Sequence, residues 1–497
     1  MDFTEIISWF NANWQEWFIY DPRKPILFNS GLFLVLFLLF YPIYILTTNA
    51  KTYAMRNLYV VAFSLFFYYK SSGLFFALLI FTSVFDYNIG QLLYAETRRS
   101  RRKLLLAISI FINLGLLVYF KYTNFLIDNY NSIFSGDITF YNIILPVGIS
   151  FYTFQSMSYV IDIYRKELEP ARNVIDYMFF VSFFPQLVAG PIVRAADFIP
   201  QIYKRLNLTK EDVNTALFLI IGGLIKKAVI SDYISVNFVD RVFDAPMSYS
   251  AFENLMASYG YALQIYCDFS GYSDMAIGIA LLMGFVLPPN FRTPYKSGSI
   301  TEFWRRWHIS LSTWLRDYLY ISLGGNRKGK FRTYLNLFIT MLLGGLWHGA
   351  SWKFVIWGIL HGLALVVERL FKNVISIPKN YVTRFLRILL TFHFVVFCWI
   401  FFRAKDFATA FTVIANISEI QFKPEQWLTV LSGYQNVFIL MLVGYVWHFL
   451  PTAFISFLKS SFDKMPILVK SFILALTFWV VYATATSGSQ PFIYFQF

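Results

Sequence analysis

The chain has 497 residues, of which 57% are hydrophobic, 21% are aromatic and only 14% are charged. Soluble domains carry about 25% charged residues, so this composition excludes an ordinary soluble protein and indicates a polytopic membrane protein. The net charge of +14 does not call for a nucleic-acid partner, because the basic residues lie in short loops between apolar runs, where the positive-inside bias accounts for them. Cys267 and Cys398 each lie in an apolar run and predict neither a disulfide framework nor a thiolate metal site.

The first third of the chain predicts an interfacial segment followed by four membrane helices. Residues 1–17 carry three tryptophans and lack the positive n-region of a signal peptide, which is typical of a segment at the membrane interface. Apolar runs of about twenty residues are long enough to cross a bilayer as helices, and they occur at 26–46, 54–70, 73–94 and 104–126. The basic cluster 98–103 is therefore assigned to the cytoplasm.

The middle of the chain predicts a broken or doubled membrane segment. Further apolar runs occur at 141–161, 173–196, 214–235 and 253–286, the last being long enough for two elements. If the basic segments 98–103 and 292–332 are both cytoplasmic, the number of complete crossings between them is even. Either 253–286 is two elements, or another segment is broken or re-entrant. The breaks at Pro146-Val-Gly148 and at Pro185 with Gly190-Pro191 suit the second alternative.

The last third predicts five more helices, at 333–349, 352–371, 383–402, 436–450 and 467–486, with an interfacial excursion over 405–426. We therefore expect an all-α polytopic membrane protein with about 11–13 membrane elements. The chain shows no low-complexity tract and no soluble domain, so a single integral membrane domain over 1–497 is predicted.

Polar residues interrupt three of the segments that precede the basic loop. A charged residue at the centre of a membrane helix costs about 2.5–3.5 kcal/mol, so such residues usually face a bundle interior or a cavity. Gln155, Gln186 and Asp268 are examples. Each one alone is explained by interhelical hydrogen bonds or ion pairs, whereas their concentration favours a shared polar cavity.

Two of the five histidines, His308 and His348, lie in the polar stretch 302–350. His308 follows Trp304-Arg-Arg-Trp, and we expect it to be an interfacial histidine paired with Glu302 or Asp317. His393 and His448 stand in aromatic runs and are interpreted as packing or interface residues. His361, in Gly358-Ile-Leu-His-Gly362, is left open between a structural and a functional role.

His348 differs from the other histidines because Gly344, Gly345 and Gly349 surround it. Each glycine costs about 1 kcal/mol in a helix relative to alanine, which indicates a break or a close backbone approach beside the imidazole. If the chain is helical from Arg332, His348 lies about 24 Å further along the axis, within a hydrocarbon layer of about 30 Å. A desolvated histidine stays neutral and is able to accept a proton from a hydroxyl group.

Common catalytic motifs do not occur. The segment Gly324-Gly-Asn-Arg-Lys-Gly329-Lys330 fits the spacing of a phosphate loop, but Phe331 replaces the final Ser or Thr and no strand pattern precedes it. Its basic residues either contact phosphates of a donor or belong to a solvated loop. The chain has no Gly-x-Ser-x-Gly elbow and no His-Glu-x-x-His, so serine-triad and zinc-protease chemistry lack their usual support, and we expect no metal.

The motifs resemble those of the membrane-bound O-acyltransferases, and within them the bacterial branch that includes alginate O-acetyltransferase. The resemblance covers 141–371. It rests on 150–159, Phe184-Pro-Gln-Leu-Val-Ala-Gly-Pro-Ile-Val-Arg194, Tyr266-Cys-Asp-Phe-Ser-Gly-Tyr-Ser-Asp274, 303–318 and Leu346-Trp-His-Gly-Ala350. Ser322, where proline is expected before Leu-Gly-Gly, and Ser351-Trp-Lys353 depart from the pattern and put the particular substrate in doubt.

The resemblance implies an acyl group that passes from a cytoplasmic donor, acetyl-coenzyme A or another carrier, to a hydroxyl group. His348 matches the near-universal histidine of the family and His308 its second polar position. The resemblance also implies a ring of helices around a thin, funnelled centre with tilted or re-entrant segments, with N-terminal helices at 1–135, a catalytic core at 136–371 and C-terminal helices at 372–497. Residues expected to bind the donor or substrate are Trp304, Arg305, Arg306, Arg316, Asp317, Asn326, Arg327, Gln155 and Asp268.

On this basis we expect an enzyme of the bacterial plasma membrane that O-acetylates an exported polysaccharide such as alginate, together with an extracytoplasmic serine esterase-like partner. Peptidoglycan O-acetylation and D-alanyl transfer to teichoic acid are alternatives within the class. A transporter or flippase is the alternative from another class, because polar residues in membrane helices and a broken midplane segment suit it equally.

Overall fold

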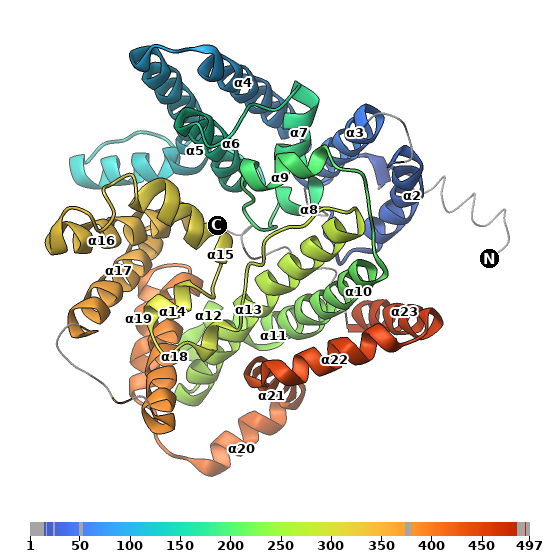
Figure 1. The fold of residues 1–497 in the computed structure, drawn as a ribbon. Helices are drawn as coiled ribbons and strands as arrows, with labels where there is room; N and C mark the ends of the chain where they lie inside the picture. Colours follow the sequence, from blue (N-terminus) through green and yellow to red (C-terminus); the bar gives the residue numbers. More distant parts are fainter. Residues whose placement is uncertain are drawn as a thin grey trace. The chain divides into compact units, whose positions relative to one another are not determined.

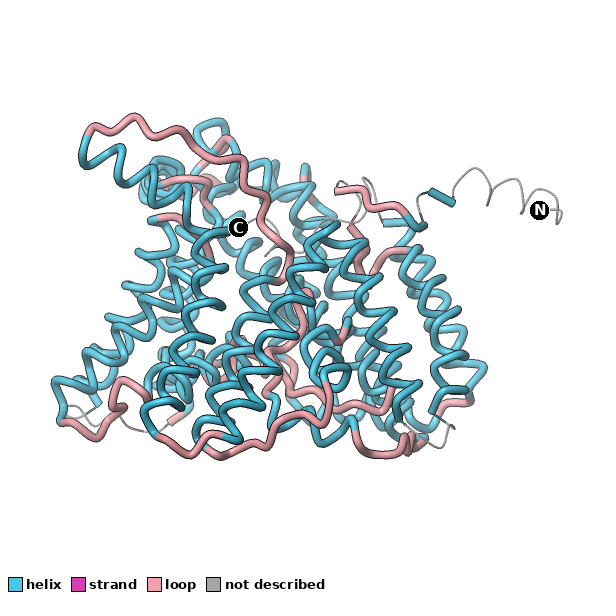
Figure 2. Tube along the Cα trace, turned by 90° about the horizontal axis from the view of Figure 1, so that it is seen from above, coloured by secondary structure: helices cyan, strands magenta, loops and turns pink. Residues whose placement is uncertain are grey.

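A computed structural model describes residues 14–15, 17–22, 25–48, 53–372, 378, 380–484 and 493. The regular structure of these residues is helical, with no strand among them, as Figures 1 and 2 show. The predicted all-α fold class is confirmed. Residues 1–13 of the expected interfacial segment lie outside the described part of the chain. By its internal contacts the chain forms two compact units, one of Met1–Thr209 with Ile279–Leu287 and the other of Lys210–Gly278 with Pro288–Phe497.

The first unit is a set of helices that are connected in part by buried side-chain hydrogen bonds. Its helices are α2 (Gly31–Thr48), α3 (Tyr53–Ser72), α4 (Phe76–Ala95), α5 (Arg99–Phe134), α6 (Ile149–Arg165), α7 (Val174–Ser182), α8 (Phe184–Leu187) and α9 (Ala195–Ile202). Asp86 of α4 accepts hydrogen bonds from Ser109 Oγ at 2.7 Å and Asn113 Nδ2 at 2.9 Å, both in α5. Such pairs satisfy polar groups between apolar helices.

The expected break at Pro185 is present in the first unit. Helix α7 ends at Ser182, and the short α8 begins at Phe184, with Pro185 in its first turn. Proline lacks a backbone N–H and fits only the first turn of a helix, which explains why 173–196 does not form one continuous helix. The alternative, two elements within 253–286, is wrong, because α13 (Ala251–Leu282) is a single helix.

The remaining helices belong to the second unit, apart from the last turn of α13, which belongs to the first. The first are α10 (Lys210–Leu224), α11 (Asp232–Ile234) and α12 (Asp240–Asp244), which the π-helical turns η2 (Ile225–Ser231) and η3 (Ser235–Val239) join. After α13 come α14 (Ile300–Trp304), α15 (Ile309–Trp314) and the π-helical η6 (Leu315–Tyr320). The last are α16 (Gly329–His348), α17 (Trp352–Lys372), α18 (Tyr381–Arg403), α19 (Phe407–Ser418), α20 (Pro424–Gly433), α21 (Gln435–Phe449), α22 (Thr452–Lys464) and α23 (Ile467–Thr484). Short 3₁₀ turns lie at Gly73–Phe75, Pro246–Ser248 and Pro294–Lys296.

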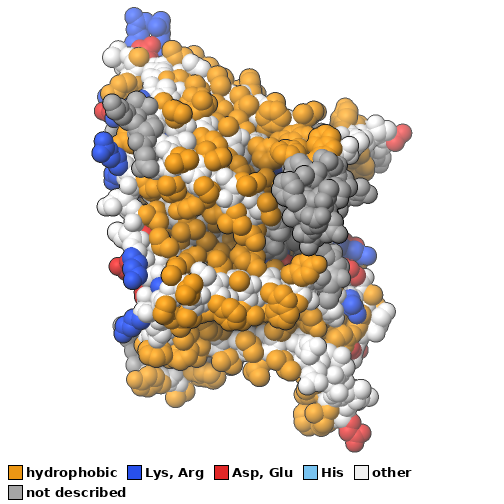
Figure 3. Space-filling model, turned by 90° about the vertical axis from the view of Figure 1, so that its right-hand side faces the viewer, with side chains coloured by type: hydrophobic (Ala, Val, Ile, Leu, Met, Phe, Trp, Pro, Cys, Tyr) orange, Lys and Arg blue, Asp and Glu red, His pale blue; other side chains and the backbone are white. Residues whose placement is uncertain are grey.

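Among the described residues, seven helices are long and apolar enough to cross a membrane, or up to eight if α20 and α21, which meet at a 91° bend, count as one span. Other elements that the sequence predicted to lie in the membrane also form helices, but these are either too short or not apolar enough to be counted as spans. They include α6, α7, α13 and α16. Figure 3 shows a face on which hydrophobic side chains prevail and Lys and Arg side chains lie toward the margins. This distribution is typical of a membrane protein.

Candidate functional site

His348 is the last residue of α16, so the predicted break beside the imidazole is present. The backbone of Gly349 is extended, and three residues later α17 begins and packs back along α16. A Cβ atom on Gly345 would lie 2.4 Å from the carbonyl oxygen of Phe354 and 2.8 Å from the Cα atom of Gly358. The two helices therefore touch through their backbones, and only glycine permits this approach.

Aromatic rings surround the His348 imidazole. Its ring centroid lies 5.2 Å from that of Trp347, 5.0 Å from that of Trp357 in α17, and 5.3 Å from that of Phe402 in α18. The side chain is 3% exposed. Side chains of three helices thus place this histidine among aromatic rings.

His308 lies at the start of α15 in a strained backbone conformation. Its φ angle is +43°, in the left-handed region that non-glycine residues rarely adopt, and its side chain is fully buried. A strained backbone persists only where the surrounding structure compensates for its cost, and such residues cluster at functional sites. Burial lowers the pKa of His308 to about 3, so its imidazole is neutral at physiological pH.

Asn290 fixes the orientation of the His308 ring. Its Oδ1 atom lies 3.1 Å from His308 Nδ1 and accepts a hydrogen bond from Ser310 Oγ at 2.9 Å, while its Nδ2 atom donates to Ser273 Oγ at 3.2 Å. A carbonyl oxygen only accepts, so His308 Nδ1 carries the proton and Nε2 is the basic nitrogen. The sequence predicted Glu302 or Asp317 as partners; the structure shows Glu302 bridged to Arg306 at 2.8 Å and Asp317 to Arg316 at 2.6 Å.

Trp347 connects the two histidines. Its ring centroid is 6.3 Å from that of His308 and 5.2 Å from that of His348. The structure therefore brings together two residues that are forty positions apart in the sequence. Both are buried in the second unit, and both are predicted site residues.

His361 lies in the same aromatic cluster, one ring further from His348. It is fully buried, with centroid distances of 4.7 Å to Trp357 and 5.2 Å to Trp304. Neither ring nitrogen has a hydrogen-bond partner among the described residues. This environment favours the structural alternative for His361.

A cavity of about 520 Å³ lies between α14, α15, η6, α16 and α17, and predicted residues Trp304, Arg305 and Arg316 line it. Arg369 adds a third guanidinium group, and Ile309, Leu337 and Leu365 add an apolar wall. Trp304 also packs against Trp357 at 5.6 Å, so one tryptophan joins the cavity wall to the cluster around His348. Guanidinium groups bind phosphates and carboxylates, so the cavity offers both anion-binding groups and apolar surface.

The other predicted residues lie apart from this cavity. Arg306 bridges to Glu302, and Asn326 and Arg327 lie exposed in the turn before α16. Asp268 Oδ1 pairs with Lys227 Nζ at 2.5 Å, and its Oδ2 accepts a hydrogen bond from the Ile493 backbone N–H at 3.0 Å, which favours a structural role. Gln155 is buried in α6 of the first unit, and its amide has no hydrogen-bond partner among the described residues.

Sequence reasoning missed Asn290, Trp357 and Arg369. Asn290 follows Pro288-Pro289 in a loop, and nothing in its local pattern points to a histidine eighteen positions later. Trp357 lies ten positions after Trp347 in an apolar run, where the usual interpretation of a tryptophan is an anchor at the membrane interface. The described residues contain no group of three His, Cys, Asp or Glu side chains that would hold a metal ion.

Comparisons with known proteins show the family to which the chain belongs. Residues 170–408 match the model of the membrane-bound O-acyltransferase family. The chain is 38% identical to a probable alginate O-acetylase of Pseudomonas putida over 95% of this chain and 100% of that one. It is 39% identical to a peptidoglycan O-acetyltransferase of Helicobacter pylori over 79% and 80% of the two chains, and 31% identical to a teichoic acid D-alanyltransferase of Bacillus subtilis over 54% and 71%. The chain belongs to the membrane-bound O-acyltransferase family.

Proposed function

We propose that this O-acyltransferase lies in a bacterial plasma membrane and moves an acetyl group from cytoplasmic acetyl-coenzyme A, or a similar thioester, toward an exported polysaccharide such as alginate. The observation that carries the proposal is the buried His348 at the end of α16, within an aromatic cluster that Trp304 joins to the arginine-lined cavity. The similarity to a probable alginate O-acetylase along almost the whole chain supports the substrate class.

His348 has two chemically balanced roles in this proposal. As a general base, it takes the proton of the acceptor hydroxyl while the hydroxyl oxygen attacks the thioester carbonyl; the C–S bond then breaks and the thiolate receives that proton. As an acyl carrier, its ring nitrogen attacks the thioester, the C–S bond breaks, and the ring N–H proton passes to the departing thiolate; the acceptor hydroxyl oxygen then takes the acyl group, the C–N bond breaks, and the hydroxyl proton returns to the ring. In both, the neutral His308 binds the donor or orients its acyl group.

The second part of the proposal concerns the partner and the alternatives. An extracytoplasmic serine esterase-like protein would receive the acetyl group and complete its transfer to the glycan. Peptidoglycan is a second acceptor, favoured by the similarity to the Helicobacter pylori peptidoglycan O-acetyltransferase. D-alanyl transfer has weaker support, because the similarity to the D-alanyltransferase covers only 54% of this chain.

The test is the amount of cell-surface acetate in strains that carry His348→Ala or His308→Ala, with protein levels verified. We expect loss of acetylation in the His348→Ala strain and a strong reduction in the His308→Ala strain. His393→Ala is a matched control, since His393 is exposed and bonds to Tyr259 away from the cluster. Retained acetylation in the His348→Ala strain would contradict the catalytic assignment, and substrate movement without covalent acylation would indicate a transporter.

A further inference from the structure

A second cavity lies at the end of the second unit opposite the basic loop. Helix α16 leads from the basic turn to His348, α17 returns along it, and α18 is long and apolar enough to cross again. Arg387 near the start of α18 donates to the Gly298 carbonyl at 3.0 Å, and Arg403 at its end pairs with Asp240 at 2.6 Å. If the basic loop is cytoplasmic, the residues after Arg403 are extracytoplasmic.

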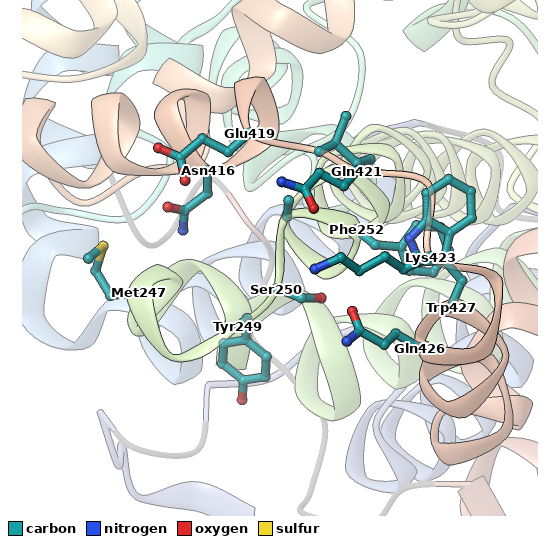
Figure 4. A pocket seen from close by; sticks show the side chains of 12 residues that line it. Met247, Tyr249, Ser250, Phe252, Asn416, Glu419, Gln421, Lys423, Gln426 and Trp427 are labelled. Atoms are coloured by element: carbon teal, nitrogen blue, oxygen red, sulfur yellow. The ribbon is translucent and has the colours of Figure 1, made fainter.

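This cavity, of about 280 Å³, lies between the start of α13, the end of α19 and the start of α20 (Figure 4). Its volume is just below the range of about 300–1,000 Å³ for small-molecule sites, which suits one sugar ring better than a lipid or a large cofactor. It lies apart from the arginine-lined cavity, with which it shares no residue.

Its wall combines stacked aromatic rings with flexible polar groups. The Phe252 and Trp427 rings stack at 4.7 Å and 11°, and Figure 4 shows the side chains of Gln421, Lys423 and Gln426 gathered beside them. A carboxamide both donates and accepts, as does a sugar hydroxyl, and an aromatic pair offers an apolar surface for ring C–H groups. Lys423 adds a cation suited to a sugar carboxylate, and Glu419 adds a carboxylate that accepts hydrogen bonds from sugar hydroxyl groups.

Other polar groups hold the frame of the cavity. Asn416 Nδ2 donates to the Pro246 carbonyl at 2.9 Å, and Glu253 accepts from Ser250 Oγ at 2.7 Å and from the Ser250 backbone N–H at 2.8 Å. The Asn416 bond ties the end of α19 to the 3₁₀ turn that precedes α13, and the Ser250–Glu253 bonds fix the first turn of α13 itself. A preformed cavity of this kind loses less entropy on binding a ligand.

We propose that this cavity binds a sugar ring of the exported polysaccharide, and so holds the acceptor glycan at the face where the acetyl group emerges. The inference rests on the proposed function, since it assigns an acceptor-binding site to the same protein. A peptide segment of a partner protein is the competing occupant. The small size of the cavity and its carboxamide lining favour the sugar, because protein anchors at interfaces are usually large aromatic or Arg side chains in desolvated pockets.

The experiment measures binding of an unacetylated mannuronate hexasaccharide to the purified full chain in lipid nanodiscs, by microscale thermophoresis and saturation-transfer NMR. We expect Gln421→Ala/Gln426→Ala to weaken binding about tenfold, consistent with the loss of two hydrogen bonds. Thr429→Ala is the matched control, because Thr429 is exposed on the same helix and does not line the cavity. Both glutamines are exposed, so the double variant is expected to fold.

His348→Ala separates this inference from the proposed function. We expect this variant to bind the hexasaccharide like wild type while acetylation is lost. If His348→Ala instead acetylates normally, the catalytic assignment of His348 fails even where binding persists. Absence of hexasaccharide binding, or binding that the double variant leaves unchanged, would overturn the sugar site. A photo-crosslinking residue at position 426 that captures a protein in cells and no glycan would overturn it in favour of a docking surface.

Discussion

The Oδ1 atom of Asn290 lies 3.1 Å from His308 Nδ1, in a site where Asn290 is 1% exposed. This contact joins the loop after α13 to the start of α15 and determines which nitrogen of His308 is basic. The other contacts of Asn290, to Ser310 and Ser273, hold its amide in that orientation. Asn290 is thus a positioning residue for a predicted catalytic histidine.

Asn290→Asp is expected to make acetylation sensitive to acid. A carboxylate beside His308 favours the imidazolium form, so it raises the pKa of His308 above the value of about 3 that burial imposes. If neutral His308 is the active form, activity then falls as pH decreases through the raised pKa. The measurement is the pH profile of acetate transfer in membrane vesicles. An Asn290→Asp profile that overlays wild type would contradict the positioning role.

His308 is also expected to contribute to acid sensitivity of the fold. Its pKa is about 6.5 in the unfolded chain and about 3 in the folded protein, so between these values the unfolded state binds the extra proton. The contribution of His308 to stability is therefore fully present above about pH 6.5 and is lost as pH decreases toward the folded pKa of about 3. We expect His308→Asn to show a shallower decline of the unfolding temperature between pH 6.5 and 4.5. Parallel declines in the two proteins would show that His308 does not titrate in this way.

Gly345→Ala is expected to separate α16 from α17 near His348. The added Cβ atom would lie 2.4 Å from the Phe354 carbonyl, and overpacking of this kind typically costs about 1–3 kcal/mol. Acetylation should fall further than the amount of folded protein, since His348 moves with the end of α16. The measurements are the unfolding temperature in detergent and acetate transfer per folded molecule.

Gly222→Ala is the control for this substitution. Gly222 is helical in α10, and a Cβ atom there meets nothing within 4 Å, so alanine should stabilise the helix by about 0.5–1 kcal/mol. Equal effects of the two substitutions would contradict the close approach as the reason for glycine at 345.

Arg305→Gln is expected to weaken donor binding. Arg305 lines the cavity of about 520 Å³, and the loss of a hydrogen bond to a charged phosphate raises KM for the donor about tenfold. The maximal rate should change little, because the residue is remote from the reacting acyl group. Arg327→Gln is the control, because it removes the same positive charge from an exposed turn that lies outside the cavity. Equal KM values for the two variants would place the donor elsewhere.

Asp268→Asn is expected to reduce stability and leave chemistry intact. Asp268 and Lys227 form a buried ion pair, and Lys227 keeps a second partner in Asp232 at 2.8 Å. The cost should therefore be smaller than the roughly 3–5 kcal/mol for leaving a buried charge with no partner. Acetate transfer per folded molecule should equal wild type. A selective loss of transfer with an unchanged unfolding temperature would restore Asp268 to the substrate-binding residues.

Local chemistry explains which features were predictable. Proline at 185 lacks the backbone N–H that a helix interior uses, and Gly349 follows His348 where α16 ends, so both breaks were visible in the sequence. The single helix over 251–282 was not distinguishable from two shorter ones, because hydropathy alone does not show where a long apolar run turns. The short helix α22 over Thr452–Lys464 was missed because its mixed polarity gives no membrane signal.

The sequence by itself determined the membrane class and the basic loop, since hydropathy and charge are patterns of neighbouring residues, and the resemblance of its motifs predicted His308 and His348 as site residues. Only the tertiary structure decided that Asn290 holds His308, that Trp347 lies between the two histidines, and that Arg369 joins Arg305 in one cavity. These relationships join residues far apart in the chain, and they follow from how helices pack, which local preferences do not specify.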